Sequence, residues 1–559
     1  MLIECVPNFS EGRDRSVIDS IAAEISGTEG AVLLDVDPGR ATNRTVVTFA
    51  GPPEAVLEAA FRSIRTAAER IDMTQHRGEH ARMGATDVCP FVPMQGATME
   101  DCVALAERLG RRVGEELGIP VYLYGEAARH PSRHRLPDIR QGEYEALPEK
   151  LLDPSFAPDF GPARFVPKSG ATAIGARPFL IAWNLNLNTR DKKLANRIAA
   201  ELRETGKPER DAAGRIVREA GGEARRVPGR FSELQGGGWY IAEYGRAQIS
   251  FNLMNYKVTG LHDVFDAASA EAEKIGVRVT GSELVGLVPL EALLDAGDHY
   301  LARQGRTTGV PEAERVHAAV LSLGLSEIGR FDPREKIIEY RYHGAPRGLA
   351  AMRVHEFVDE LSSDSPAPGG GSVAALCGAL SAALSSMVAA LTWSKAGMEA
   401  VRPSMSGSGT RAQALKDWFV LAVDLDTAAF NEVLAARRLP RSTPAEQESR
   451  RAAIERANQA ATRVPLAVLA RSVEALELAA EVAASGNPAS VSDAGVAAVC
   501  ALAAAEGASL NVRINLPSVA DEAAAAEMRA SHDERLARAR QLARAAQSTV
   551  DDVLSRSSS

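Results

Sequence analysis

Short apolar runs alternate with amphipathic stretches over roughly the first 325 residues. The runs are rich in Val, Ile, Leu and Tyr and are bounded by polar residues, a pattern that predicts β-strands. The stretches at 53–71, 99–117, 191–203 and 261–275 have the spacing of amphipathic helices. Strands that alternate with helices in this way are typical of an α/β protein. The strand-like runs are LIECVP, AVLLDVD, RTVVTFAG, VYLYG, FLIAWNLNLN, AQISFNLMNY and GVRVTGSELVGLVP.

A Pro/Gly-rich crossing at 154–177 interrupts this rhythm. The pattern therefore predicts two α/β subdomains, at 1–178 and 179–328. Within the second subdomain, the charged and glycine-rich stretch 206–236 predicts a surface insertion.

Strand signals nearly vanish beyond a linker at 329–353, and alanine-rich helical patterns take their place. This change predicts an all-α helical bundle over 354–559. Three turn signals divide its helices, namely RPSMSGSG, LPRSTP and GNPAS.

The segment 373–391 carries no charge and is long enough to span a membrane. Its content is mainly Ala, Ser and Gly, however, so its drive into hydrocarbon is weak. Its larger apolar residues recur every three or four positions and form one narrow stripe, which favours a helix packed in a bundle or in an oligomer seam. We therefore expect no membrane span. The stripe consists of Val373, Leu376, Leu380, Leu384, Met387 and Leu391.

Composition narrows the possible compartments and partners. The net charge of −9 argues against a nucleic-acid-binding protein, which would need a basic face. The five cysteines contain no CxxC pair, as expected of reduced thiols in a cytoplasmic protein. The N-terminal MLIECVPNFSEGRD has no basic stretch ahead of an apolar run, so we expect no signal peptide.

The stretch QHRGEHARMGATDVCPF concentrates histidines, a glutamate and arginines within a few positions. His76 to His80 spells H-x-x-E-H, a zinc signature when it lies on a helix. Gly78 and Gly84 instead favour a loop between a helix and a strand. Three readings stay open at this point: a zinc site, a solvated basic loop, and a catalytic imidazole that titrates near neutrality.

Two other stretches of the first part carry candidate chemistry. Asp35 and Asp37 stand at the exit of a predicted strand, where they either orient a histidine or belong to a charged turn. The loop around Arg164, Lys168 and Arg177 has glycines and cations that could hold carboxylates, or it simply links the subdomains. It contains neither GxxxxGK[ST] nor GxGxxG, so nucleotide binding is poorly supported.

In the helical part, Asp424 and Asp426 are two residues apart and must point to different faces of their helix. Asn511, Arg513 and Asn515 are polar residues inside an otherwise apolar run. The stretch SPAPGGGSVAALCG could be a domain linker, a phosphate-cradling loop, or the mouth of an active site.

Taken together, these motifs resemble a known family. ECVPNFSEG, LLDVD, TNRTV, GEHARMGATDVCPFVP, VYLYGEAAR, GEYEALPEKL, APDFGP and ELVGLVPLEALLDA resemble the formiminotransferase domain. SPAPGGGSVAAL, DLDTAAFNEVL, RRLPRSTPAEQ, SDAGVAA and LNVRINL resemble the cyclodeaminase domain. In this order they are similar to the formiminotransferase-cyclodeaminase family over nearly the whole chain.

The resemblance implies two consecutive reactions of histidine degradation. The first moves the formimino group from N-formimino-L-glutamate to N5 of tetrahydrofolate, and the second closes the product to 5,10-methenyltetrahydrofolate with release of ammonia. It also implies two α/β subdomains whose sheets face each other across a folate tunnel, a helical bundle, and a homo-oligomer. Tetrahydrofolate, expected in its polyglutamylated form, would be the co-substrate, and no metal is implied because folate carries the one-carbon unit.

The resemblance also assigns residues. His80 would be the general base of the transfer, and Asp37 would hold it in its working tautomer. Asp426 would shuttle protons during cyclisation. Gly369, Gly370 and Gly371 would form part of the cyclodeaminase folate pocket, near Asp426 or its copy from a neighbouring subunit. The folate loop would be Gly161, Pro162, Ala163, Arg164, Phe165, Val166, Pro167, Lys168, Ser169 and Gly170.

Some features depart from the family pattern. Ala81 stands where relatives often have Pro, Lys168 is an added cation in the folate loop, and the insertion at 206–236 is longer than expected. The helical part also resembles stand-alone methenyltetrahydrofolate cyclohydrolases. A hydrolytic reaction, or a purely assembling role for the bundle, therefore stays an alternative.

Overall fold

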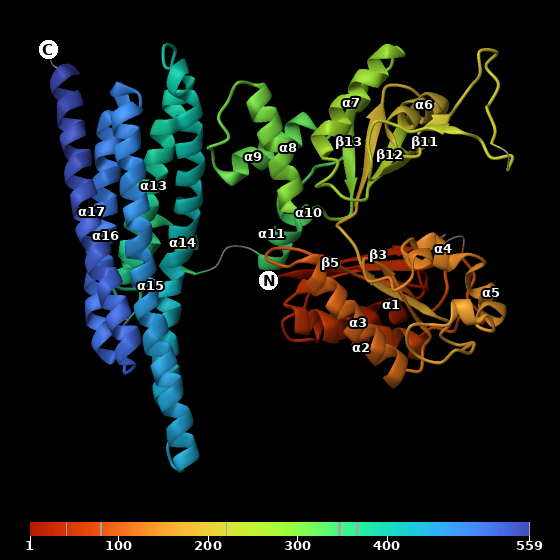
Figure 1. Ribbon diagram of the computed structural model, residues 1–559, viewed down its shortest axis with the longest axis horizontal. Helices are drawn as coiled ribbons and strands as arrows, with labels where there is room; N and C mark the ends of the chain where they lie inside the picture. The colour runs from red at the N-terminus through yellow and green to blue at the C-terminus, as the bar shows by residue number, and fades with distance from the viewer. Residues whose placement is uncertain (41, 79–80, 220, 345–347, 365–366, 558–559) are drawn as a thin grey trace. The chain divides into compact units, whose positions relative to one another are not determined.

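The computed structural model describes residues 1–559 except 41, 79–80, 220, 345–347, 365–366 and 558–559. The chain forms two compact units. The first contains Met1–Asp295 and Val320–Gly344, and the second contains Ala296–Ala319 and Ala345–Ser559. Sheets and helices mix in the first unit and long helices dominate the second, so the expected α/β part followed by an all-α bundle is confirmed (Figure 1).

The first sheet of the first unit has the strand order β1-β4-β2-β5-β7-β6, and β3 pairs with β4. The pairings of β7 with β5 and with β6 are parallel, and the others are antiparallel. Its strands are β1 (Ile3–Cys5), β2 (Asn8–Phe9), β3 (Val32–Gly39), β4 (Arg44–Gly51), β5 (Thr86–Pro93), β6 (Val121–Gly125) and β7 (Thr172–Ala176). The accompanying helices are α1 (Arg15–Ser26), α2 (Pro53–Arg70), α3 (Met99–Glu116), α4 (Leu136–Arg140) and α5 (Glu143–Lys150), with 3-10 turns at Pro131–Arg133 and Pro154–Phe156.

Alternation within the strands determines which face of this sheet is covered. Ile3 and Cys5 are fully buried in the core that α1, α2 and α3 share with the sheet. Helix α2 contributes Val56, Ala60 and Ile64 to the same core, at the spacing of one helical face. Burial of each large apolar side chain stabilises the fold by about 1.5–3 kcal/mol relative to exposure.

The second sheet is antiparallel, with the order β11-β12-β8-β13. On β8, Trp183 is buried and stacks on Phe265 of α7, at 6.1 Å between ring centroids. The alternate residues Asn184 and Asn186 point to the opposite face of the sheet. The strands are β8 (Ile181–Leu187), β11 (Leu234–Ile241), β12 (Arg246–Leu253) and β13 (Val279–Val285), and the helices packed with them are α6 (Lys192–Leu202) and α7 (Leu261–Lys274). Four more helices follow, α8 (Leu290–Arg303), α9 (Glu312–Ser322), α10 (Pro333–Lys336) and α11 (Ile338–His343).

The insertion at 206–236 lies on the surface, as its composition predicts, but it is more ordered than a charged loop. Strands β9 (Lys207–Pro208) and β10 (Arg226–Val227) pair at its base. Two further bridges, Arg210 with Ile216 and Arg218 with Ala224, continue it as a narrow arm (Figure 1, yellow).

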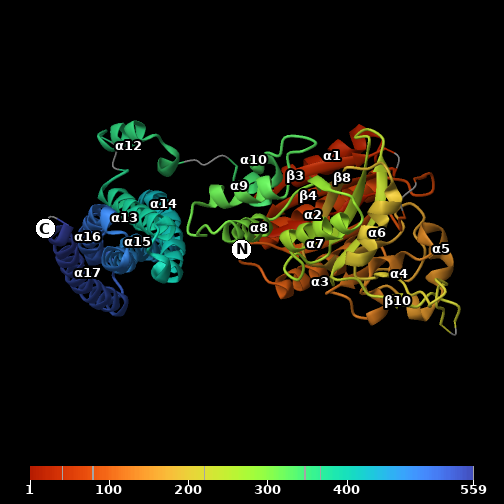
Figure 2. The ribbon, with the colours of Figure 1, turned by 90° about the horizontal axis from the view of Figure 1, so that it is seen from above.

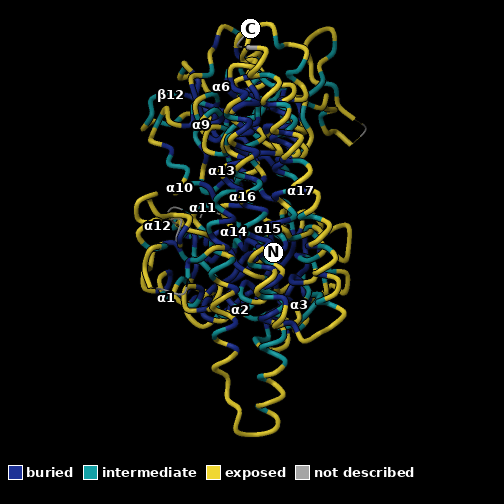
Figure 3. Tube along the Cα trace, turned by 90° about the vertical axis from the view of Figure 1, so that its left-hand side faces the viewer, coloured by how far each residue is buried: buried dark blue, intermediate teal, exposed yellow. Residues whose placement is uncertain are grey.

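The bundle consists of long helices that run roughly parallel to one another and are seen end-on in Figure 2. The tip of the α14–α15 hairpin extends past the other helices and is exposed (Figure 3). The bundle helices are α12 (Val354–Leu361), α13 (Gly370–Ser394), α14 (Arg402–Arg438), α15 (Pro444–Ser485), α16 (Val491–Asn515) and α17 (Glu522–Ser557). Short 3-10 turns occupy Leu349–Ala351, Glu399–Val401, Pro488–Ser490 and Leu516–Ser518.

One expectation for the bundle needs correction. RPSMSGSG is not a turn, because α14 begins at Arg402 and runs through it; its small residues Ser408 and Gly409 are buried in helix packing. The stripe on α13 belongs to a bundle helix, as predicted, and Leu376 and Leu384 pack on the core. Leu380 and Leu391 of the same stripe are 49% and 45% exposed, and most of the buried face consists of Ala, Gly and Ser. The turns at LPRSTP and GNPAS are confirmed.

Two helical segments, Gly370–Ser394 and Pro488–Ser518, are long and apolar enough to cross a membrane by length and composition alone. About half of each apolar window is buried in the bundle, 56% and 50% respectively, as is usual for core helices of soluble proteins.

Glu4 is a buried carboxyl in the first sheet. It is 2% exposed, and its Oε2 has no hydrogen-bond partner among the described residues. Burial raises the pKa of Glu4 to about 8, with Glu339 adding to the rise and Arg177 opposing it. The folded protein therefore holds a proton that the unfolded chain releases at the ordinary pKa of 4.5. Stability from this group falls as the pH rises from 4.5 to about 8.

We expect Glu4→Gln to remove this pH dependence, because the amide resembles the protonated acid. From pH 6 to pH 9 the wild-type first unit should lose about 3 kcal/mol more of unfolding free energy than the variant. Calorimetric unfolding of both proteins at the two pH values measures the difference. Parallel curves for variant and wild type would contradict the assignment.

Candidate active sites

The loop between α2 and β5 carries the predicted catalytic histidine, and its end is fixed by Asp87. This carboxylate is 1% exposed, its Oδ1 accepts the backbone N–H of Met83 at 2.9 Å, and its Oδ2 pairs with Arg140. A buried, hydrogen-bonded ion pair tolerates little movement, so Asp87 holds the last residues of the loop in place.

His76 and Arg82 fix the middle of the same loop. Arg82 donates to Glu145 through two bonds of 2.7 and 2.8 Å and to Glu143 at 2.9 Å. Nε2 of His76 lies 2.8 Å from the carbonyl oxygen of Asn43, and Nδ1 accepts from Arg82 at 3.4 Å. Burial lowers the pKa of His76, which favours the neutral ring. With both ring nitrogens engaged, His76 is a structural residue, which speaks against the zinc reading of H-x-x-E-H.

His80 lies outside the described residues, as does Glu79. Asp37 is exposed on β3, and its carboxylate makes no hydrogen bond to any residue that the structure describes. The assignment of His80 as general base and of Asp37 as its partner therefore stays a prediction.

The structure places the predicted folate loop, Gly161–Gly170, beside the histidine loop. Gly84 bridges Gly170, and the N–H of Ala85 donates to the carbonyl of Ser169 at 2.8 Å. Gly170 has φ +66°, and a Cβ there would lie 2.2 Å from the carbonyl oxygen of Met83, so only glycine fits. The ammonium group of Lys168 donates to the carbonyl of Glu69 at 2.8 Å and is thus partly committed.

The second sheet adds polar residues that the sequence analysis missed. Nε1 of Trp239 donates to Gln248 at 3.2 Å, Gln248 to Asn186 at 2.8 Å, and Asn186 to Glu327 at 2.7 Å. On the same face, Asn184 is 6% exposed, and its carboxamide has no hydrogen-bond partner among the described residues. The alternation N-L-N-L-N in the sequence was the available signal, because it places every asparagine of this strand on one face.

In the bundle, the predicted glycine turn and aspartate come together within one chain. A Cβ on Gly371, at the start of α13, would lie 2.0 Å from Oδ1 of Asp426 on α14. A Cβ on Gly370 would lie 3.6 Å from Nδ2 of Asn511 on α16. Three helices therefore meet at this turn, and the missing side chain of Gly371 provides the space for the carboxylate.

The surroundings of Asp426 suit proton transfer. Burial raises the pKa of Asp426, and hydrogen bonds from the backbone and hydroxyl of Ser372 oppose the rise. The single proton of the Ser372 hydroxyl can instead be donated to the carbonyl of Val423 at 2.8 Å, a bond that ties α13 to α14. Asp424 points elsewhere, as the helical spacing predicts, and accepts the N–H of Leu349 at 2.7 Å.

The three polar residues at the end of α16 have different surroundings. Asn511 lies at the glycine turn and donates to the carbonyl of Gly507 at 2.9 Å. Asn515 donates to the carbonyl of Ala461 at 2.8 Å and braces α15, whereas Arg513 is exposed. Only Asn511 therefore joins the candidate site.

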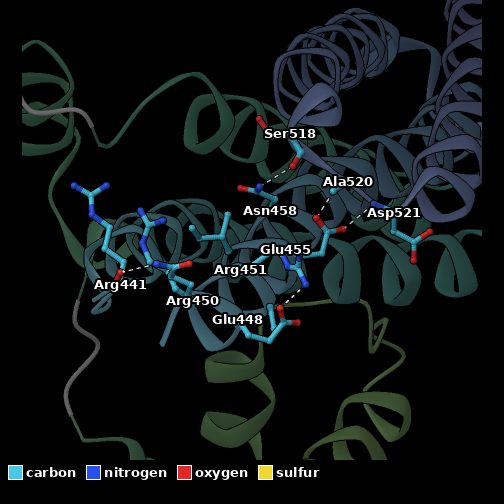
Figure 4. A pocket seen from close by; sticks show the side chains of 12 residues that line it. Arg441, Glu448, Arg450, Arg451, Glu455, Asn458, Ser518, Ala520 and Asp521 are labelled. Carbon is cyan, nitrogen blue, oxygen red and sulfur yellow. Dashed lines mark hydrogen bonds and ion pairs between the residues drawn. The ribbon is translucent and has the colours of Figure 1, made fainter. Parts of the chain in front are cut away.

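A separate cavity of about 640 Å³ opens beside α15 (Figure 4). Several of its polar groups are paired: Arg451 with Glu448, Glu455 with the N–H groups of Ala520 and Asp521, and Asn458 with the carbonyl of Ser518. It contains none of the predicted site residues, and we assign it no function.

Comparison with protein families covers nearly the whole chain. Residues 2–177 match the formiminotransferase domain, N-terminal subdomain, residues 182–343 match the formiminotransferase domain, and residues 353–534 match formiminotransferase-cyclodeaminase. Formimidoyltransferase-cyclodeaminase of Mus musculus is 47% identical, over 93% of each chain. The chain belongs to the formiminotransferase-cyclodeaminase family. The resemblance inferred from the motifs is thereby confirmed.

Two further relatives each match one part of this chain. Glutamate formimidoyltransferase of Streptococcus pyogenes is 39% identical over 54% of this chain and 93% of its own length. Methenyltetrahydrofolate cyclohydrolase of Methylorubrum extorquens is 38% identical over 31% of this chain and 84% of its own length. Proteins similar to the transferase part and to the helical part of this chain therefore also occur separately.

The glycine turn of the second site yields a sharp prediction. Gly371→Ala forces the Asp426 carboxylate to move, because the new Cβ would overlap Oδ1. A displacement of about 1 Å can cost on the order of 100-fold in rate, so cyclodeaminase turnover should fall by about that factor. Gly407→Ala on α14 is the control, since it lies outside the glycine turn and a Cβ there meets nothing within 4 Å.

Cyclisation of supplied 5-formiminotetrahydrofolate by both variants makes the comparison, with formimino transfer as an internal reference. Equal cyclisation rates for the two variants would show that the Gly371 contact does not position Asp426.

Proposed function

We propose that this chain, a formiminotransferase-cyclodeaminase of histidine degradation, catalyses two consecutive steps on tetrahydrofolate. The observation that carries the proposal is the match of residues 2–177, 182–343 and 353–534 to both domains of the family, in the same order. The glycine turn that meets Asp426 supports a second active site of its own in the bundle.

In the first step, N5 of tetrahydrofolate attacks the formimino carbon of N-formimino-L-glutamate. His80 accepts the proton from N5, and the C–N bond to the glutamate nitrogen breaks, so that L-glutamate leaves after it gains a proton. Asp37 would hold the imidazole in the tautomer that accepts this proton. Gly161–Gly170 would bind the folate, and the position of this loop beside the histidine loop supports that role.

In the second step, N10 attacks the formimino carbon and forms a ring. The formimino nitrogen enters protonated, as an amidinium group. Asp426 takes the proton from N10 and delivers it to that nitrogen, which then carries three hydrogens and leaves as ammonia, so that the positive charge stays on the methenyl product. The raised pKa of Asp426 supports this role, because a carboxyl that titrates closer to neutrality can both accept and donate. The chemistry uses no metal, because folate itself carries the one-carbon unit.

The compartment and the folate form are part of the proposal. All five cysteines are free thiols, and those of Cys5 and Cys89 share a hydrogen bond of 3.5 Å and no disulfide, which supports a reducing cytoplasm. The exposed guanidinium of Arg164, which makes no ion pair with any described residue, supports a folate with a polyglutamate tail. Neither nucleic acid nor membrane is part of the proposed function.

A cyclohydrolase reaction in the bundle is the second candidate, because the Methylorubrum extorquens protein of that name is 38% identical to this part. The two reactions differ in substrate and product. The deaminase closes the ring of 5-formiminotetrahydrofolate and releases ammonia, whereas the cyclohydrolase opens the methenyl ring by adding water and releases no ammonia.

One assay tests both steps. Purified protein receives formiminoglutamate and tetrahydrofolate, and glutamate, ammonia and methenyltetrahydrofolate are followed together. We expect ammonia and methenyltetrahydrofolate in equal amounts. Asp426→Asn should leave glutamate release unchanged and reduce ammonia release by about 100-fold or more, as expected for loss of a general acid–base group.

The structurally engaged neighbour Asp424 provides the control, since Asp424→Asn keeps the oxygen that accepts the Leu349 N–H. Ammonia release at the wild-type rate from Asp426→Asn would overturn the assignment. Glutamate release without any ammonia from the wild type would favour the cyclohydrolase or an assembly role.

We also propose that the chain forms a homo-oligomer through the exposed apolar face of α13 and α16. The two helices pack side by side, and each has large apolar residues on its exposed face. Apolar patches of this kind on soluble proteins are usually covered by a partner. The exposed residues are Leu380, Met387 and Leu391 on α13 and Val496, Val499 and Leu510 on α16.

Met387→Glu should therefore reduce the oligomer, because it would bury a charge at the contact. Light scattering coupled to size-exclusion chromatography measures the mass. Leu321→Glu, at an exposed residue of α9, is the control. An unchanged mass for Met387→Glu would exclude this face as the contact.

A further inference from the structure

Residues 304–310, which connect α8 to α9, lie on the bundle although the sequence places them within the transferase part. The segment Ala296–Ala319 belongs to the same compact unit as α13–α17. Within it, Thr307 and Gly309 are buried, whereas their neighbours Gly305 and Arg306 are exposed. The second half of the connection therefore packs on the bundle helices.

Side chains of α13 and α14 recognise the backbone of this connection. Nε1 of Trp393 donates to the carbonyl of Gly305 at 2.8 Å, and the hydroxyl of Ser386 donates to the carbonyl of Gly309 at 3.2 Å. The Thr307 hydroxyl accepts the N–H of Gly309 at 3.0 Å and lies 3.4 Å from the hydroxyl of Ser406. The bonds to the N–H and the carbonyl of Gly309 satisfy backbone groups that burial would otherwise leave unpaired.

The closest contact is between two glycines. A Cβ on Gly309 would lie 2.8 Å from backbone atoms of Gly409 on α14, closer than real Cβ contacts occur. The loop therefore needs a residue without a side chain at this point, and a Cβ on Gly409 would in turn lie 3.3 Å from Cα of Gly309, which is tight. This accounts for the sequence SGSG inside a helix, where glycine costs about 1 kcal/mol relative to alanine. Gly407 has open space around its own Cβ position and takes no part in the contact.

We propose that residues 304–310 form a docking loop that holds the transferase part of the chain on the bundle, independently of the peptide connection at 345–353. Helix α8 is continuous from Leu290 to Arg303, so its first turns, in the first unit, lead directly into the docked loop. The chain is then attached to the bundle twice, once through the docked loop and once through the peptide link. The seat consists of Ser386, Trp393, Ser406 and Gly409.

The consequence for catalysis rests on the proposed pair of activities. A second attachment shortens the distance that the two parts can separate, and so raises the effective concentration of one site around the other. The loop should therefore affect the passage of 5-formiminotetrahydrofolate between the sites more than either reaction alone.

The test cuts the peptide link in the folded full-length chain. Residues 345–347 are replaced by the recognition sequence of a site-specific protease, the protein is cleaved, and the fragments are run on size-exclusion chromatography. We expect the fragments to elute together. They should separate when Gly409→Leu is present, because a side chain there meets Gly309 within 3.4 Å.

Gly407→Leu is the matched control, since it lies on the same helix and has the same change in helix propensity without the contact. If the cleaved fragments elute together in both variants, the docking loop is not what holds them, and the proposal is overturned. If the two fragments of the cleaved protein separate even without a glycine substitution, the proposal is overturned as well.

A second variant guards against damage to the bundle itself. Gly309→Ala changes the loop and leaves every helix intact, and Gly329→Ala, with open space around it, is its control. Gly309→Ala should separate the cut fragments and lengthen the lag before methenyltetrahydrofolate appears, with unchanged rates on separately supplied substrates. A loss of cyclodeaminase rate equal to the loss in coupled flux would show that the loop only supports the bundle.

Failure of the proposed function and failure of the docking loop give different results. If the intact chain lacks one of the two activities on supplied substrates, the proposed function fails, while co-elution of the cut fragments still reports on the docking loop.

Discussion

The small residues along α13 are the constraint on which the second half of the structure depends. Ala, Gly and Ser fill its buried face, so α14 and α16 can approach its backbone closely. Close approach is what brings the α13 N-terminus against Asp426 and Asn511. Several large side chains of the same helix, such as Leu380 and Leu391, lie on its outer face. One packing choice thus produces the candidate site and the apolar outer face together.

The first unit achieves its rigidity differently, through buried charge and glycine. Asp87 fixes the end of the histidine loop and Arg82 its middle by hydrogen bonds, and the glycines at 84 and 170 let the folate loop lie directly against it. In both units a missing side chain lets one segment reach another that is distant in sequence. Gly309 and Gly409 repeat the device where the docking loop meets the bundle.

Much of the fold could be predicted because the spacing of apolar residues along the chain indicates each strand and helix. The strand and helix runs of the first 325 residues and the change to helices after 353 follow from burial on one face of each element. The helix through RPSMSGSG could not, because serine and glycine are turn residues in isolation and favour a helix only when a partner demands small side chains. The polar face of the second sheet was missed for a related reason: N-L-N-L-N predicts a strand, but not what its polar side will face.

By itself, the sequence determined the order of elements, the division into an α/β part and a bundle, and the family with its chemistry, because these rest on residue type and spacing. It also required Asp424 and Asp426 to point apart, since two residues on a helix are separated by about 200°. Only the tertiary structure decided that Asp426 meets Gly371 while Asp424 binds Leu349, and that His76 is structural. The physical reason is that a close contact depends on the partner's shape, and the partner is dozens to hundreds of residues away along the chain.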